Sequence, residues 1–218
     1  MEGVVFANGQ KVDKAGTLLK TDIEILVKSS SLKYVGRGGL KLESALENFE
    51  VDVNGYVALD IGASTGGFTD CLLQSGASKV YAVDVGYGQL DWKLRNDSRV
   101  IVMEKINARH LVEGDIPEKV DIVVMDASFI SLTKIIAPSI LFLKSGGLLI
   151  ALIKPQFEVG KGEVGKGGIV RDENKHKEVV QKINQHLEKL GFKIKGIIPS
   201  PILGAEGNKE FLIAATKD

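Results

Sequence analysis

Short apolar runs alternate with helix-like segments along most of the chain. Five such runs have the length and composition of buried strands, at 57–61, 79–85, 99–104, 120–126 and 147–155. Segments with helical spacing of apolar residues separate or follow them, at 67–76, 91–96, 132–144 and 174–191. Because apolar strands separated by helices are typical of a parallel sheet covered on both faces, the pattern predicts an α/β fold. The last two strand-like runs, 192–200 and 209–216, have no helix between them and predict an antiparallel hairpin at one edge.

Residues 1–33 follow a different pattern. Two short β-like runs surround Asn8-Gly9 within 3–12, and an alternating run follows at 23–27, which together predict a small β-rich unit. Residues 34–55 are predicted to be a glycine-loosened linker and a first helix, and 56–218 the α/β domain. The first strand begins directly after Met1, so we expect the chain to be part of a longer parent.

Composition narrows the function classes. The chain has 218 residues, 44% of them hydrophobic, enough for one α/β domain with a small appendage. Its 28 basic and 28 acidic residues exclude a wholly basic surface but not a local basic patch. The single cysteine, Cys71, cannot form an internal disulfide, which favours a reducing cytoplasm and a buried structural thiol. No apolar run reaches the roughly 18 residues of a membrane span, and the three histidines show no metal-ligand spacing.

A glycine loop joins the first strand of the α/β domain to the next helix, in VALDIGASTGGFTDCLL (57–73). A nucleoside triphosphate loop requires a lysine where Phe68 stands, and a dinucleotide loop requires a glycine where Ser64 stands. S-adenosylmethionine has no phosphate and requires neither. It is therefore the favoured ligand, with a dinucleotide as the weaker alternative.

Aspartates close three strands of the predicted sheet. Asp60, Asp84 and Asp126 all lie at carboxyl ends, where open α/β sheets bind ligands. Asp84 could accept hydrogen bonds from both ribose hydroxyls, and Asp60 could meet the ammonium of the methionine part directly or through water. Each aspartate alone could simply cap a helix, but three around one glycine loop favour a ligand site. Asn107-Ala108 suits either an adenine contact or a plain turn.

Several longer motifs together carry a family likeness. YVGRGGLKLESAL, LDIGASTGGFTDCLL, VDVGYGQLDWKLR, DASFISL, IKPQFEVG and GNKEF occur in that order. The chain thereby resembles the TlyA family of haemolysin-like proteins, related to the FtsJ group of ribosomal RNA ribose 2′-O-methyltransferases. The resemblance implies a class I methyltransferase sheet of seven strands with an antiparallel last strand, and S-adenosylmethionine as cofactor without a metal. The cofactor positions that it implies are Asp60, Gly62, Ala63, Ser64, Thr65, Gly66, Gly67, Phe68, Asp84, Val85, Asn107 and Ala108.

The same resemblance implies a catalytic Lys-Asp-Lys-Glu tetrad. Matched motif by motif, it falls on Lys41, Asp126, Lys154 and Glu210. A free lysine is protonated at neutral pH, and a neighbouring cation with partial burial would lower its pKa. We therefore expect Lys154 to lie nearest the reacting hydroxyl, as base or charged stabiliser, with the other three as orienting partners. Each residue alone could be an ordinary surface or helix-start side chain.

Candidate RNA contacts lie outside this tetrad. The unit at 1–33 resembles the second half of an alpha-L RNA-binding domain whose two opening helices are missing. A glycine-rich segment at 156–177 carries more basic than acidic side chains, which suits either phosphate contacts or a solvated connector. The candidate RNA-binding residues are Arg37, Lys161, Lys166 and Arg171.

The leading hypothesis is an enzyme that methylates a ribose 2′-hydroxyl of ribosomal RNA, with cytidine as the nucleoside that the resemblance implies. Its partners would be ribosomal RNA or ribosomal subunits in the cytoplasm, and no membrane. One alternative is an RNA-binding ribosome-assembly factor with a vestigial cofactor pocket. Another is a haemolysin or pore-former, which would require a long membrane segment that the sequence does not contain. The oligomeric state has no signature in the sequence.

Overall fold

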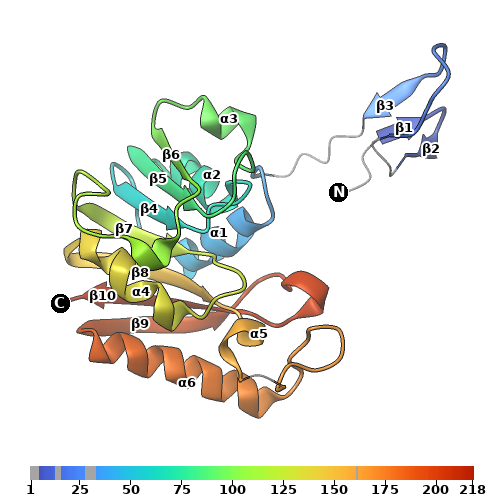
Figure 1. The fold of residues 1–218 in the computed structure, drawn as a ribbon. Helices are drawn as coiled ribbons and strands as arrows, with labels where there is room; N and C mark the ends of the chain where they lie inside the picture. The colour runs from blue at the N-terminus through green and yellow to red at the C-terminus, as the bar shows by residue number, and fades with distance from the viewer. Residues whose placement is uncertain (1–4, 13–15, 28–32, 161) are drawn as a thin grey trace. The chain divides into compact units, whose positions relative to one another are not determined.

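The computed structural model describes residues 5–12, 16–27, 33–160 and 162–218. Contacts divide the chain into two compact units, with the division between Lys33 and Tyr34. Figure 1 shows the small N-terminal unit in blue and the larger unit from light blue to red.

The N-terminal unit contains a three-stranded antiparallel sheet in the order β2-β1-β3. Its strands are β1 (Val5–Ala7), β2 (Gln10–Lys11) and β3 (Ile25–Val27). Asn8 and Gly9 form the β1–β2 turn with φ of 45° and 77°. Two successive positive φ angles are what a tight two-residue hairpin requires, and Asn and Gly adopt them most readily. The predicted Asn8-Gly9 hairpin is therefore confirmed for its described residues.

The larger unit is built on a seven-stranded sheet in the order β6-β5-β4-β7-β8-β10-β9. Its strands are β4 (Val57–Ile61), β5 (Lys79–Asp84), β6 (Val100–Glu104), β7 (Val120–Met125), β8 (Leu143–Ile153), β9 (Phe192–Pro199) and β10 (Phe211–Lys217). Strands β6, β5, β4, β7 and β8 pair in parallel, whereas β10 is antiparallel to both β8 and β9. The α/β sheet and its antiparallel closing hairpin are confirmed, and β10 enters between β8 and the edge strand β9.

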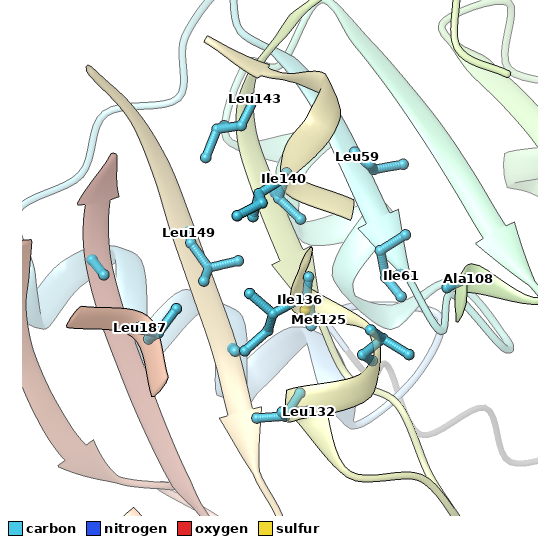
Figure 2. Close-up of a cluster of buried hydrophobic side chains, with 14 of the residues drawn as sticks. Leu59, Ile61, Ala108, Met125, Leu132, Ile136, Ile140, Leu143, Leu149 and Leu187 are labelled. Atoms are coloured by element: carbon cyan, nitrogen blue, oxygen red, sulfur yellow. The ribbon is translucent and has the colours of Figure 1, made fainter. Parts of the chain in front are cut away.

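Helices cover both faces of this sheet (Figure 1). The helices are α1 (Gly38–Asn48), α2 (Gly67–Gln74), α3 (Trp92–Arg95), α4 (Ile136–Ser139), α5 (Pro155–Glu158) and α6 (Glu173–Lys189). Apolar residues of α1 and α2 pack on one face of the central strands, and those of α4 and α6 pack on the other. Figure 2 shows the second cluster, in which Leu59, Ile61 and Met125 of the sheet meet Ile136. Side chains alternate along a strand, so Asp60 points to the opposite face, toward α2.

The predicted helix at 132–144 is wrong. The structure has a 3₁₀ turn at Leu132–Lys134, the short α4, a second 3₁₀ turn at Ile140–Phe142, and then β8. Pro138 has no N–H to continue a helical ladder, and the Ser139 hydroxyl donates to the Ile135 carbonyl at 2.7 Å. The apolar spacing nevertheless marks one buried face, because Leu132, Ile136 and Ile140 are buried whereas Lys134, Ala137 and Leu141 are exposed.

Helix α1 begins at Gly38, inside the stretch that the glycines were expected to loosen. A Cβ at Gly39 would collide with the Tyr34 side chain, and one at Gly67 would lie 2.9 Å from the Gly39 nitrogen. Glycine at these positions therefore allows α1, α2 and Tyr34 to pack closely. The function of Gly39 and Gly67 is close approach of two helices rather than flexibility.

Candidate active site

The loop between β4 and α2 requires glycine at specific positions. Gly62 and Gly66 have φ of 84° and 98°, in the left-handed region that glycine favours. A Cβ at Gly62 would lie 2.8 Å from the Asp126 carbonyl oxygen, and one at Gly66 would collide with Leu94. The loop therefore packs against the end of β7 on one side and against α3 on the other. The rest of its backbone faces outward.

Asp84 fastens this loop to the next one. Its Oδ2 accepts from the Ser64 N–H at 2.8 Å, and its Oδ1 accepts from the Gly86 N–H at 2.6 Å. A carboxylate has about four acceptor positions, so two remain after these bonds. Asp84 can therefore hold the loop and still accept hydrogen bonds from a pair of ligand hydroxyls.

A cavity of about 410 Å³ opens at the carboxyl ends of the central strands. Six of the predicted cofactor residues line it, namely Gly62, Ser64, Asp84, Val85, Asn107 and Ala108. A smaller hollow of about 160 Å³ shares Gly62 and Ser64 with it and adds Ala63, Thr65, Gly67 and Phe68. Binding cavities for small ligands measure about 300–1,000 Å³. The sequence-predicted residues therefore gather around space of the right size for a nucleoside-containing ligand.

Asp60 and Gly66 are the two predicted cofactor residues that line neither space. Asp60 is fully buried, and its Oδ2 accepts from the Thr69 hydroxyl at 2.6 Å. Burial raises the pKa of Asp60 to about 7, and the charges of Asp126 and Asp84 act in the same direction. Its Oδ1 is buried without a hydrogen-bond partner in the described part of the chain. Such an atom calls for a missing partner, such as a water or a ligand cation.

Asn107 fits both predicted roles. Its Oδ1 accepts from the Arg109 N–H at 3.1 Å and caps the 3₁₀ turn Ala108–His110. Its side chain and that of Ala108 also line the larger cavity. The capped turn fixes both residues at the cavity wall, where the adenine of a nucleoside could contact them.

The strand register brings Lys154 and Glu210 together. Ile153 of β8 lies opposite Phe211 of the antiparallel β10, so Lys154 and Glu210 follow at the same end of adjacent strands. Asp126 leaves the end of β7, the neighbour of β8 on its other side. Lys41 comes from the second turn of α1, whose first residue, Gly38, lies against the Asp126 carboxylate. Four segments far apart in sequence thus converge at one edge of the sheet.

These four side chains form two ion pairs. Lys154 Nζ lies 2.6 Å from Asp126 Oδ1 and donates to the Ser128 hydroxyl at 2.8 Å. Lys41 Nζ donates to Glu210 Oε2 at 2.6 Å, and both of these side chains are buried. Lys154 and Asp126 line the smaller hollow, whereas Lys41 and Glu210 lie outside its lining. Pairing offsets the high cost of burying a lysine or a carboxylate, so the arrangement can hold both ammonium groups in place, with that of Lys154 at the smaller hollow.

Two residues that sequence reasoning did not single out belong to the same site. Ser128 accepts a hydrogen bond from Lys154, and Phe129 is 90% exposed at the rim of the cavity. Phe129 has φ of 62°, a conformation that costs a bulky residue energy and is typical of functional sites. Its ring lies 5.1 Å from that of Phe157. The signal for both was present in the motif DASFISL, which was used only to recognise the family.

Three of the four candidate RNA contacts lie in the described part of the chain. Arg37, Lys166 and Arg171 are exposed, and Lys161 lies outside the described residues. The segment between α5 and α6 is anchored, because the buried Asn208 accepts from the Val170 N–H at 3.0 Å and donates to the Gly168 carbonyl at 3.0 Å. Asn208 precedes Glu210 by two residues, so this anchor holds the basic segment beside the Lys41–Glu210 pair.

No group of three or more His, Cys, Asp or Glu side chains in the described ranges could hold a metal ion. No helix in those ranges is long and apolar enough to span a membrane.

Known proteins resemble this chain in sequence, in fold or in both. The family described as FtsJ-like methyltransferase matches residues 34–217. The 16S/23S rRNA (cytidine-2′-O)-methyltransferase TlyA of Mycobacterium tuberculosis is 43% identical over 97% of this chain and 79% of its own length. A Streptococcus thermophilus protein with a provisional hemolysin name is 45% identical, with a TM-score of 0.85 over 99% of this chain and 79% of that chain. An S-adenosylmethionine-dependent methyltransferase from Mesorhizobium loti shares the fold alone. It is 14% identical, with a TM-score of 0.60 over 84% of this chain and all of its own length.

Proposed function

This chain belongs to the FtsJ-like methyltransferase family, and from that premise we propose that it methylates a ribose 2′-hydroxyl of ribosomal RNA, at a cytidine. The observation that carries the proposal is the Lys154–Asp126 ion pair in the lining of the smaller hollow, together with the buried Lys41–Glu210 pair outside that lining. The name of the M. tuberculosis relative supports both the ribose position and the base. Ribosomal RNA would place the protein in the cytoplasm, and the reaction needs no metal.

The cavity fits S-adenosylmethionine. When bound, S-adenosylmethionine would supply an activated methyl group on its sulfonium. The two remaining acceptor positions of Asp84 suit the ribose hydroxyls, and Asn107 and Ala108 suit the adenine. The unpartnered Oδ1 of Asp60 suits the ammonium of the methionine part, through an intervening water. The loop at 62–68 lets a ligand pass close to its backbone and carries no lysine for a phosphate. S-adenosylmethionine has no phosphate, so the loop agrees with this ligand.

The chain's own residues contribute mainly positioning and charge. The 2′-oxygen gains the methyl carbon as its proton leaves to solvent, and the sulfur keeps the electron pair of the broken bond. The Lys154 ammonium group forms an ion pair with Asp126 and donates one hydrogen bond, to Ser128. With three N–H donors, it can also orient the 2′-oxygen and stabilise the negative charge that develops on it. Lys41 adds a second ammonium group, and Asp126 and Glu210 hold both in place.

Two other functions have less support. A pore-former would require a segment that enters a membrane, and no described helix is long and apolar enough to span one. An assembly factor with a vestigial pocket would not need two buried or nearly buried lysine–carboxylate pairs, which are costly to maintain without a use.

Methyl transfer to ribosomal particles tests the proposal. Purified protein, tritiated S-adenosylmethionine and either intact ribosomal subunits or naked ribosomal RNA are incubated, and label in the RNA is counted. We expect time-dependent incorporation into at least one of these RNA substrates. Absence of label in every RNA substrate, with S-adenosylhomocysteine binding intact, would favour the assembly factor.

The raised pKa of Asp60 predicts that cofactor affinity depends on pH. Protonated Asp60 cannot attract the ligand ammonium, so affinity for S-adenosylhomocysteine should rise as pH increases from 6 to 8 through the pKa of about 7. An increase of about threefold to tenfold is expected, since one pKa unit corresponds to a tenfold change. Isothermal titration calorimetry in buffers of different ionisation enthalpy should also detect proton release below pH 7.

The variant Asp60→Asn is the control for this pH dependence. Its side chain does not titrate, so its affinity should be nearly constant over the same range. An equally steep dependence in the variant would assign the effect to another group.

Phe129 is expected to stack on the base of the target nucleotide. Stacking of a base on an aromatic ring contributes about 1–3 kcal/mol, so Phe129→Ala should lower kcat/KM for RNA by about tenfold or more. Phe129→Tyr keeps the ring and should stay within about threefold of wild type. Calorimetry should show little change in S-adenosylhomocysteine affinity for either variant. Equal losses in the alanine and tyrosine variants would contradict stacking.

A further inference from the structure

Glu158 is a buried carboxylate that the proposed reaction does not use. Its side chain is 1% exposed. Its Oε1 accepts from the Leu132 N–H at 2.6 Å, and its Oε2 accepts from the Ser131 hydroxyl at 2.6 Å. Lys182 of α6 donates to the Glu158 carbonyl oxygen at 2.9 Å and to Oε2 at 3.3 Å. The carboxylate is therefore fully engaged inside the protein.

Two of the partners of Glu158, Ser131 and Leu132, lie at the end of the loop that carries site residues. This loop runs from Asp126 to Leu132 and includes Ser128 and Phe129. Lys154, at the other end of the short segment 154–158, holds the beginning of the loop through Asp126 and Ser128. Segment 154–158 therefore holds the 126–132 loop at both ends, through Lys154 at the start of the loop and through Glu158 at its end.

The spacing of these two anchors follows from helix α5. Lys154 is the residue before α5 and Glu158 is its last residue, four positions later. Lys154 has an extended backbone, and the single turn of α5 that follows it brings Glu158 back to the same loop, as the contacts of both side chains show. Pro155 suits the first position of this turn because its missing N–H would have no partner there. Between the two anchors, Phe157 supports Phe129 with ring centroids 5.1 Å apart.

The loop needs such support because its backbone is strained. Phe129 has φ of 62°, which costs about 1–3 kcal/mol and persists only where the surroundings enforce it. Glu158 accepts hydrogen bonds from the backbone N–H of Leu132, three residues after Phe129, and from the side chain of Ser131. Without these two bonds the loop could relax, and Ser128 and Asp126 would lose their alignment with Lys154.

We propose that Glu158 is a positioning residue for methyl transfer, which holds the 126–132 loop so that Asp126 and Ser128 stay on Lys154 and Phe129 stays at the cavity rim. The inference rests on the proposed function for its kinetic consequence. Glu158 acts through the loop and contacts no reacting atom. This role also accounts for the pairing of the motifs IKPQFE and DASFISL, since the lysine and glutamate of the first hold the two ends of the second.

The test compares variants of Glu158 and its partners in the full chain. Glu158→Ala should lower kcat by about 10- to 100-fold, counted per S-adenosylhomocysteine-binding site, with KM for S-adenosylmethionine changed by less than about threefold. Glu158→Gln can still accept from Leu132, and its amide can donate to the Ser131 oxygen, so its kcat should stay within about threefold of wild type. Counting per binding site removes any loss that is due only to unfolded protein.

Two further variants complete the set. Ser131→Ala removes one bond to Glu158 and should lower kcat by about three- to tenfold. It carries the test if Glu158→Ala fails to fold. Lys182→Met removes the contact from α6 but leaves both bonds to the loop, so its kcat should stay within about twofold of wild type. A kcat of Ser131→Ala within twofold of wild type, together with an unchanged Glu158→Ala where that variant folds, would overturn the proposal.

Hydrogen exchange separates this inference from the proposed function. The Leu132 amide should exchange markedly faster in Glu158→Ala, or segment 128–133 faster in Ser131→Ala, whatever the reaction is. An active wild-type enzyme with unaffected variants and unchanged exchange would contradict only the inference. A wild-type protein that methylates no RNA, with exchange increased in the variants, would contradict the proposed function and leave the structural role of Glu158 in place.

Discussion

Replacing Lys154 with methionine should lower the rate constant for methyl transfer by about 10²- to 10³-fold, the range found when one group that stabilises charge in the transition state is removed. Methionine has a similar length and fills the same space, so the neighbouring residues stay packed. It cannot orient the 2′-oxygen or stabilise its charge. The loss should appear in kcat under single-turnover conditions with saturating RNA.

Cofactor binding should survive in the Lys154→Met variant. Lys154 lines only the smaller hollow, and Asp84 and the glycine loop remain intact. Affinity for S-adenosylhomocysteine should therefore lie within about threefold of wild type, since no hydrogen bond to the nucleoside is lost. Calorimetry measures this affinity directly.

Lys144→Met is a matched control for Lys154→Met. Lys144 Nζ lies 2.6 Å from Asp121 Oδ1, the same kind of ion pair at the same distance, but its side chain is 48% exposed and away from the cavity. Exposed ion pairs contribute about 0–1 kcal/mol to stability, so this variant should fold and methylate normally. Equal activity of the two variants would remove Lys154 from the reaction.

Replacing Asp84 with alanine should weaken binding of S-adenosylhomocysteine by about 30-fold or more. The substitution removes the acceptors proposed for the ribose hydroxyls and also leaves the Ser64 and Gly86 N–H groups without their carboxylate. Each unsatisfied or lost bond to a charged group costs about 1–3 kcal/mol. The measurement is calorimetric titration at constant pH and salt.

Asp52→Ala is the matched control for Asp84→Ala. Asp52 Oδ1 accepts from the N–H two residues later, at Asn54 and 2.9 Å, as Asp84 does from Gly86, but Asp52 is exposed and outside the cavity. It should therefore bind S-adenosylhomocysteine as the wild type does. If Asp84→Ala also binds normally, the ribose of the ligand is held elsewhere.

Much of the fold could be predicted because the hydrophobic pattern reports it directly. The strand at 57–61 was placed to the residue, and the antiparallel hairpin followed from the missing helix between 200 and 209. The segment at 132–144 could not be predicted in this way. Its apolar residues recur on one buried face, but Pro138 cannot donate to the helical hydrogen-bond ladder, and the segment is divided into two 3₁₀ turns and the short α4.

The cofactor residues could be proposed from the sequence because residues that lie close together in the sequence also lie close together in the site. Gly62, Ser64 and Asp84 lie in two adjacent strand-end loops. Lys41, Asp126, Lys154 and Glu210 could be proposed only from the family motifs, because strand pairing and helix packing bring them together from segments far apart in the sequence. Phe129 was missed because an exposed aromatic in a strained loop has no periodicity.

The chemical position of the transferred methyl group tests the central proposal most directly. RNA labelled with tritiated methyl groups by the wild-type protein is hydrolysed in alkali, which requires a free 2′-hydroxyl at each cleaved linkage. We predict label in alkali-resistant dinucleotides that yield 2′-O-methylcytidine after enzymatic digestion, and none with Lys154→Met. Label in mononucleotides that carry the methyl group on the base would contradict the account.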